Sequence, residues 1–75
     1  MTTKAKINEK DLKLARHLQK IRKEKGFTQE ELAEKVGVTL TYIGYLELGY
    51  KIPNMHMLQK IAEVLKVKVK ELIPF

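Results

Sequence analysis

Histidines and a cluster of glutamates are the side chains best suited to acid–base catalysis or metal binding. They are His17, His56, Glu30, Glu31 and Glu34. The two histidines stand 39 positions apart, no glutamate of the cluster has a histidine at metal-ligand spacing, and the chain has no cysteine. A solvated helix face explains the three glutamates. We therefore expect no enzymatic activity, no metal ion and no cofactor.

Basic residues are the second group with chemical potential. The chain has 15 Lys and Arg against 9 Asp and Glu, a net charge of +6 and a pI near 9.7. Residues 1–25 hold nine basic and three acidic groups, residues 26–50 one and four, and residues 51–75 five and two. Such a balance suggests a polyanionic partner, most commonly nucleic acid. The alternative is that lysine-rich helices simply present solvated faces.

A chain of 75 residues forms one small domain, with little room for a catalytic cleft. Without cysteine, packing alone must hold it together. Its first ten residues contain three lysines but no apolar signal region, and no segment is apolar enough to span a membrane. We predict a cytoplasmic protein without membrane contact, built as a flexible basic N-terminal arm over residues 1–10 and a folded domain over residues 11–75.

Apolar periodicity and capping residues divide that domain into short helices. The first begins at about Asp11 and ends near residue 25. Thr28, with Glu31 three residues later, forms a capping-box pattern that opens a second helix over residues 29–36.

Three further helices follow. Thr39 is the N-cap of a third helix over residues 40–48, and Pro53 with Asn54 begins a fourth. The apolar stripe of the fourth helix consists of Met55, Leu58, Ile61, Ala62 and Leu65. A last helical turn holds Val69, Leu72 and Ile73. The sequence therefore predicts an all-α fold of five helices.

The turn between the second and third helices is only three residues long. Two helices joined so tightly cannot lie antiparallel with long side chains between them. The close contact between them therefore needs a small residue, which is Ala33, and the reversal of the chain needs a glycine, which is Gly37. The third helix must then turn Ile43 and Leu46 inward. The residues on its opposite side face outward: Thr41, Tyr45 and Leu48.

This central segment resembles a known family. Residues 29–48 read QEELAEKVGVTLTYIGYLEL, preceded by RKEKGFTQEELA from residue 22 and followed by LELGYKIPN to residue 54. The pattern is similar to the Cro and phage-repressor (XRE-type) helix-turn-helix family and covers about residues 12–73. The resemblance implies a compact five-helix, lambda-repressor-like DNA-binding domain. It also implies a repressor-like transcriptional regulator that binds double-stranded DNA sequence-specifically.

The resemblance further implies roles for particular residues. By position, base reading in the major groove falls to Thr39, Leu40, Thr41, Gly44 and Tyr45. Phosphate contacts fall to Thr28, Gln29, Lys25, Tyr50 and Lys51, with Gln29 at the anion-favouring start of the second helix.

Arg22 lies beside the buried stripe of the first helix, where a charge requires a partner. In relatives this arginine pairs with a glutamate near the end of the third helix, which here is Glu47. The resemblance therefore predicts a buried structural ion pair.

The sequence departs from the family where bases are read. Relatives often carry Gln, Arg, Lys or Ser there, whereas this chain has Leu, Thr and Tyr, which can contact thymine methyl groups but cannot form an arginine fork to guanine. Leu48 and Tyr50 stand where relatives more often have Asn and Lys, and the third helix has no basic residue. We expect thymine-rich contacts and reliance on DNA shape. The electrostatic contribution must then come from Lys51, from Lys23 and Lys25, and from the lysines of the N-terminal arm between Lys4 and Lys10, so we expect a shallow salt dependence.

The resemblance also implies a homodimer on DNA, because such domains usually bind pseudo-palindromes as two-fold dimers. The interface would use the last two helices and the apolar end Leu72, Ile73, Pro74 and Phe75, although Phe75 could instead pack on its own chain. We expect no small-molecule ligand.

Two alternatives remain open. The same fold serves antitoxins and restriction-modification controllers, between which the sequence does not decide. The apolar outward face at Leu40, Tyr45 and Leu48 also suits a protein-interaction or adaptor module that has lost DNA binding.

Overall fold

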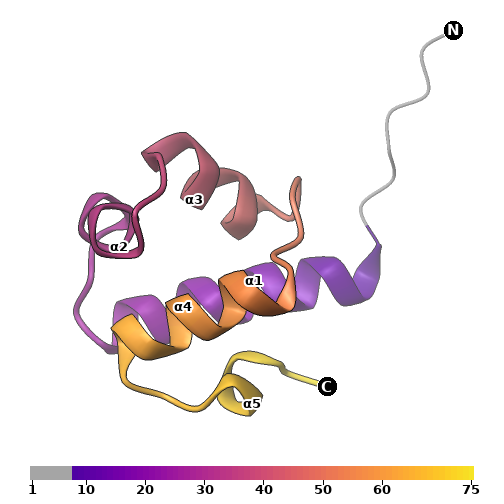
Figure 1. Ribbon diagram of the computed structural model, residues 1–75. Helices are drawn as coiled ribbons and strands as arrows, with labels where there is room; N and C mark the ends of the chain where they lie inside the picture. Colours follow the sequence, from indigo (N-terminus) through magenta and orange to yellow (C-terminus); the bar gives the residue numbers. More distant parts are fainter. Residues whose placement is uncertain (1–7) are drawn as a thin grey trace, which may run out of the picture.

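The computed structural model describes residues 8–75, and the regular secondary structure in that range consists of α-helices joined by turns and loops. The helices are α1 (Glu9–Glu24), α2 (Gln29–Val36), α3 (Leu40–Leu48), α4 (Met55–Leu65) and α5 (Val69–Leu72). In the view of Figure 1, α4 lies in front of α1, both lie below α2 and α3, and α5 lies below α4. Residues 1–7 of the predicted basic arm lie outside the described residues.

The start of the first helix was predicted two residues too late. The side chain of Asn8 caps α1 by accepting a hydrogen bond from the backbone N–H of Lys10 at 2.7 Å, so the helix begins at Glu9. Asp11 lies inside the first turn, where its negative charge and that of Glu9 stabilise the helix by interacting with the positive end of its dipole. The last two residues of the predicted arm therefore belong to the first helix.

The core lies between the helices and is built from their predicted apolar faces. Its most deeply buried large side chains come from three helices: Ile43, Ile61, Leu65 and Leu72. The predicted stripe of α4 is wrong at Met55, which is 56% exposed and does not belong to the core cluster, whereas the remaining members of the stripe are buried.

The α2–α3 turn has the predicted construction. Gly37 ends α2 with φ at 87°, a left-handed conformation that glycine adopts without steric cost, and its N–H donates to the carbonyl of Ala33. Thr39 then caps α3 through the backbone N–H of Tyr42. In Figure 1 α2 is seen almost end-on and α3 from its side, so the two helices are not antiparallel. Within residues 8–75 no helix combines the length and apolar character needed to cross a bilayer.

Candidate nucleic-acid interface

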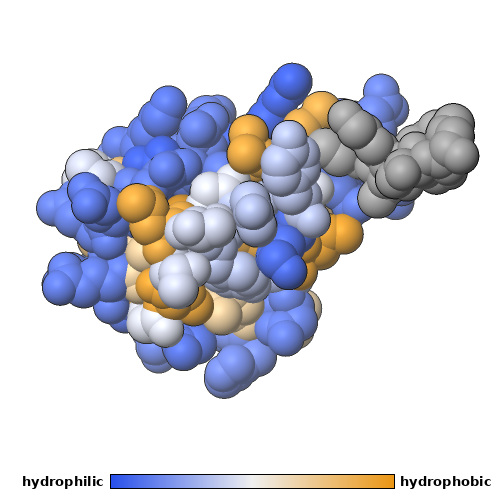
Figure 2. Space-filling model, turned by 90° about the horizontal axis from the view of Figure 1, so that it is seen from above, coloured by the Kyte–Doolittle hydropathy of each residue, from blue (hydrophilic) through white to orange (hydrophobic). Residues whose placement is uncertain are grey.

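The outward face of α3 is the main candidate site. Ile43 and Leu46 are almost completely buried and fix the rotation of the helix. On the opposite side Tyr45 is 40% exposed, and Thr41 and Leu48 are exposed as well, while Leu40 at the start of the helix is 45% exposed on its flank. Seen from above, apolar and weakly polar side chains occupy the middle of this side of the molecule and hydrophilic ones its margins (Figure 2). The predicted base-reading side chains are therefore accessible together.

This face carries no formal charge. Glu47 is the one acidic residue of α3, which has no basic residue, and the Glu47 side chain points inward and is buried. Tyr42, on the flank of the helix, is half-buried against the core. What remains accessible on α3 can offer hydroxyl groups and apolar surface to a partner.

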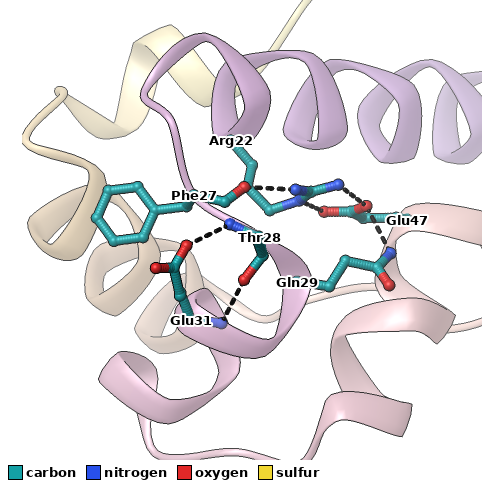
Figure 3. A network of polar contacts seen from close by, with 6 residues as sticks. All are labelled: Arg22, Phe27, Thr28, Gln29, Glu31 and Glu47. Carbon is teal, nitrogen blue, oxygen red and sulfur yellow. Dashed lines mark hydrogen bonds and ion pairs between the residues drawn. The ribbon is translucent and has the colours of Figure 1, made fainter.

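The predicted ion pair between Arg22 and Glu47 forms, and it ties α1 to α3 (Figure 3). The guanidinium donates through Nε to Oε2 of Glu47 at 2.6 Å and through Nη2 to Oε1 at 3.1 Å. Its Nη1 donates to the backbone carbonyl of Phe27. Both charged residues are buried, and every buried side-chain polar atom in the described chain has a hydrogen-bond partner. The pair is bidentate, the strongest geometry for an arginine and a carboxylate.

Gln29 also joins this network, which the sequence did not indicate. Its amide Nε2 donates to Oε1 of Glu47 at 2.9 Å, so the side chain predicted to bind phosphate is directed toward the ion pair (Figure 3). The amide keeps a second N–H, and the backbone N–H groups at the start of α2 still offer an anion site. The structure therefore attaches the predicted phosphate contact to α3 through Glu47.

The Thr28 capping box orients the start of α2. The Thr28 hydroxyl accepts from the backbone N–H of Glu31 at 3.0 Å, while the Thr28 N–H donates to the Glu31 carboxylate at 2.8 Å. This second hydrogen bond is the main cause that lowers the pKa of Glu31 below its ordinary value of 4.5, with smaller contributions from the Thr28 hydroxyl and the charge of Lys35. The Glu31 carboxylate therefore caps the N-terminal end of α2.

An open groove of about 520 Å³ lies between α1, the start of α2 and the start of α3. Its lining includes Lys23, Thr28, Gln29 and Leu40. Predicted phosphate contacts therefore lie beside Leu40, one of the predicted base-reading residues. Gln19 and Glu30 also line it and were not predicted, although Gln19 stands one helical turn before Arg22. Lys25 lines a different groove, with Val64 and Lys66.

The segment after α3 folds back onto that helix. The backbone N–H groups of Tyr50 and Lys51 both donate to the carbonyl of Tyr45, and the rings of Tyr45 and Tyr50 pack with their centroids 5.9 Å apart. Tyr50 and Lys51 are exposed next to the end of α3. Ile52 and Met55 are exposed in the same segment, and no sequence signal distinguished them from core residues.

The predicted dimer interface at the C-terminal end is wrong at Leu72, which is completely buried in the chain's own core. Ile73 is half-buried, and Pro74 is exposed. Phe75 is exposed, and the Lys10 ammonium lies 5.5 Å from its ring centre. Within residues 8–75 no group of three potential metal-binding side chains is found.

Known proteins resemble the chain in sequence and in fold. A sequence profile of the helix-turn-helix family matches residues 18–72. The uncharacterized HTH-type transcriptional regulator YazB of Bacillus subtilis (strain 168) is 36% identical over 59 residues, which are 79% of this chain and 86% of YazB. The restriction-modification controller protein C.AhdI from Aeromonas hydrophila is 31% identical, with a TM-score of 0.78 over 81% of this chain and 92% of that chain.

A third similar protein is SinR, the master regulator for biofilm formation, solved in complex with DNA. It is 37% identical, with a TM-score of 0.73 over 79% of this chain and 95% of that chain. These likenesses confirm the predicted fold, a compact all-α, lambda-repressor-like domain of five helices.

Proposed function

The chain belongs to the helix-turn-helix family of transcriptional regulators that bind DNA, and from this premise we propose that it reads double-stranded DNA with α3 in the major groove. The observation that carries the proposal is the exposure of Leu40, Thr41 and Tyr45 on one side of a helix anchored on the other. It acts by occupying DNA and not as an enzyme. Binding to chromosomal DNA would place it in the cytoplasm.

The predicted residues divide between the bases and the DNA backbone. Base edges meet the exposed side of α3 at Thr39, Leu40, Thr41, Gly44 and Tyr45. Near the start of α3, phosphates contact the groove residues Lys23, Thr28 and Gln29. After the end of α3, they contact Tyr50 and Lys51. Phosphate contacts flanking a reading helix fix its register on the duplex. Lys23 lines the same groove as Thr28 and Gln29, which favours it as a lysine of the first phosphate site.

We also propose that two copies bind a pseudo-palindromic site. The surface that supports this is an exposed apolar cluster at the end of α3 and in the following segment: Leu48, Tyr50, Ile52 and Met55. These four residues adjoin the proposed DNA face and are uncharged. Lys51 is the one charged residue between residues 48 and 55, so little charge repulsion opposes apolar contact between two copies. This cluster replaces the C-terminal end as the proposed interface.

Selection of bound duplexes from a random pool tests the function directly. We expect a recovered site with two-fold symmetry, half-sites about one helical turn apart and two chains per duplex by sedimentation. Lys51→Ala should weaken binding to all sequences, whereas Leu40→Gln should change the recovered sequence. Ile52→Ser should lower the fraction of two-chain complexes, with Phe75→Ser as the matched exposed control. Absence of binding to any duplex at micromolar protein in low salt would reject the proposal.

A protein-interaction module is the second candidate. The exposed apolar residues Leu40, Tyr45 and Leu48 favour it, because such patches commonly bind protein partners. The duplex-binding measurement separates the two candidates. The proposed DNA binding would serve either restriction-modification control, which is the role in the name of C.AhdI, or antitoxin activity. The genes that neighbour the gene of this chain would distinguish these two roles.

A further inference from the structure

We propose that the exposed side of α3 senses the C5 methyl group of pyrimidines, so that 5-methylcytosine can replace thymine in the bound site. This inference rests on the proposed function, because it concerns the bases that α3 meets in the major groove. It makes the methylation state of the DNA a determinant of affinity.

The first step is the absence of charge on this side of α3. Glu47 is the only acidic or basic side chain of the helix, and the bidentate pair with Arg22 holds it inside the protein. The exposed groups are the aliphatic side chain of Leu40, the methyl and hydroxyl groups of Thr41 and the phenol of Tyr45. Such a surface gains most from apolar groups on the base edges, and the C5 methyl is the apolar group of the major groove.

The second step concerns the neighbouring atom of the pyrimidine. Thymine presents the O4 acceptor beside its methyl group, whereas 5-methylcytosine presents an N4 amino donor in the same place. A hydroxyl group can donate or accept, so Thr41 and Tyr45 can satisfy either one. Glu30, which lines the groove beside Leu40, can accept from an amino group. The exposed side of α3 has no charged group that would select the O4 acceptor of thymine over the N4 donor of 5-methylcytosine. The C5 methyl group, which both bases carry, is then the feature that α3 recognises.

The size of the effect follows from burying one methyl group. Its removal from water contributes ~0.8 kcal/mol, which is about a fourfold change in Kd for each contacted methyl group. We therefore expect affinity to rise by at least this factor when a duplex gains C5 methyl groups at unchanged phosphate charge.

Four repeating duplexes provide the test without knowledge of the operator. The first pair is poly(dA-dT) and poly(dA-dU), and the second is poly(dG-dC) with and without C5 methylation of every cytosine. Each pair differs only in the methyl group, so a Kd measured by fluorescence anisotropy at one fixed low salt concentration isolates it. We expect the methylated member of both pairs to bind about fourfold tighter or more.

Variants separate methyl contact from an effect of methylation on DNA shape. Leu40→Ala and Thr41→Ser remove exposed apolar groups only, and circular dichroism will verify that both variants fold. Both should bring the ratio of methylated to unmethylated affinity toward one, while Lys51→Ala should weaken all four duplexes and preserve the ratio.

Two results would overturn the inference while leaving DNA binding intact. One is equal affinity of the wild type within each pair, and the other is a ratio that Leu40→Ala and Thr41→Ser do not change. Failure to bind any of the four duplexes would instead reject the proposed function, and the inference with it.

Discussion

Glu47 is the residue on which the arrangement of the first three helices converges. Its carboxylate accepts hydrogen bonds from Arg22 of α1 and from Gln29 of α2, while its own backbone belongs to α3. The same carboxylate therefore holds the proposed reading helix against the element that bears the proposed phosphate site. A shift of α3 would break contacts with both neighbours.

Glu47→Ala should cost about 3 to 5 kcal/mol of unfolding free energy, because it leaves the buried Arg22 charge without its carboxylate. A domain of this size has only about 4 to 11 kcal/mol in total, so the variant should lose a large share of its stability. Urea unfolding followed by circular dichroism measures the loss.

Two further variants make that measurement specific. Glu47→Gln keeps an acceptor and should lose less stability, and the double variant Arg22→Met with Glu47→Leu should recover much of the loss because no buried charge remains unpaired. A Glu47→Ala protein that melts within a degree or two of the wild type would show that the pair is not structural.

At the scale of elements, the start of α2 depends on pH through its capping box. The pKa of Glu31 is lowered in the folded protein, so its carboxylate stabilises the fold fully above the ordinary value of 4.5 and loses this contribution as the pH falls through the lowered pKa. Glu31→Gln should therefore be less stable than the wild type at pH 7, with a difference that shrinks below pH 4.5.

The measurement is the urea midpoint as a function of pH from 7 to 3. Glu34→Gln, on the exposed face of the same helix, is the matched control. An equal difference between Glu31→Gln and the wild type at all pH values would contradict the assignment of Glu31 to the capping box.

Gly44 is the helix position at which stability and binding should separate. A Cβ atom added there would meet nothing within 4 Å, so Gly44→Ala should stabilise α3 by about 0.5 to 1 kcal/mol through its helix propensity. The same methyl group should weaken DNA binding, because Gly44 lies on the proposed reading side and allows close approach of the duplex.

Thermal melting and duplex titration give the two quantities on the same protein. Gly37→Ala is a useful contrast, since its Cβ also meets nothing but its φ of 87° makes alanine cost about 1 to 2 kcal/mol. Unchanged DNA affinity in Gly44→Ala would remove Gly44 from the reading side.

On the scale of the whole molecule, charge is concentrated away from the proposed reading helix. The phosphate sites contain few lysines, Lys23 on one side of α3 and Lys51 on the other, while residues 26–50 carry one basic and four acidic groups. Each neutralised phosphate contributes about −0.9 to the slope of log K against log salt. Few contacts therefore imply a weak dependence on salt.

We expect a slope clearly shallower than about −10 per dimer, and Lys51→Ala should make it shallower still by about 1 per half-site. Titration of a selected duplex at several salt concentrations measures both values. A wild-type slope near −10 would mean that further basic residues contact the DNA.

The sequence by itself determined the helices and the sides of α3. Thr28 and Thr39 predicted two helix starts because an N-cap acts on backbone groups within its own turn, and the spacing of Ile43 and Leu46 oriented α3. The same reasoning is wrong at the start of α1, where Asn8 and not Asp11 caps the helix.

The tertiary structure alone decided which partners meet across helices. It directed Gln29 to Glu47, 18 positions away, placed Lys25 in a different groove from Lys23, exposed Met55 and buried Leu72. Periodicity describes one helix at a time, whereas burial depends on what packs against it from elsewhere in the chain. The outward side of α3 therefore followed from the sequence, while the contacts between helices came only from the tertiary structure.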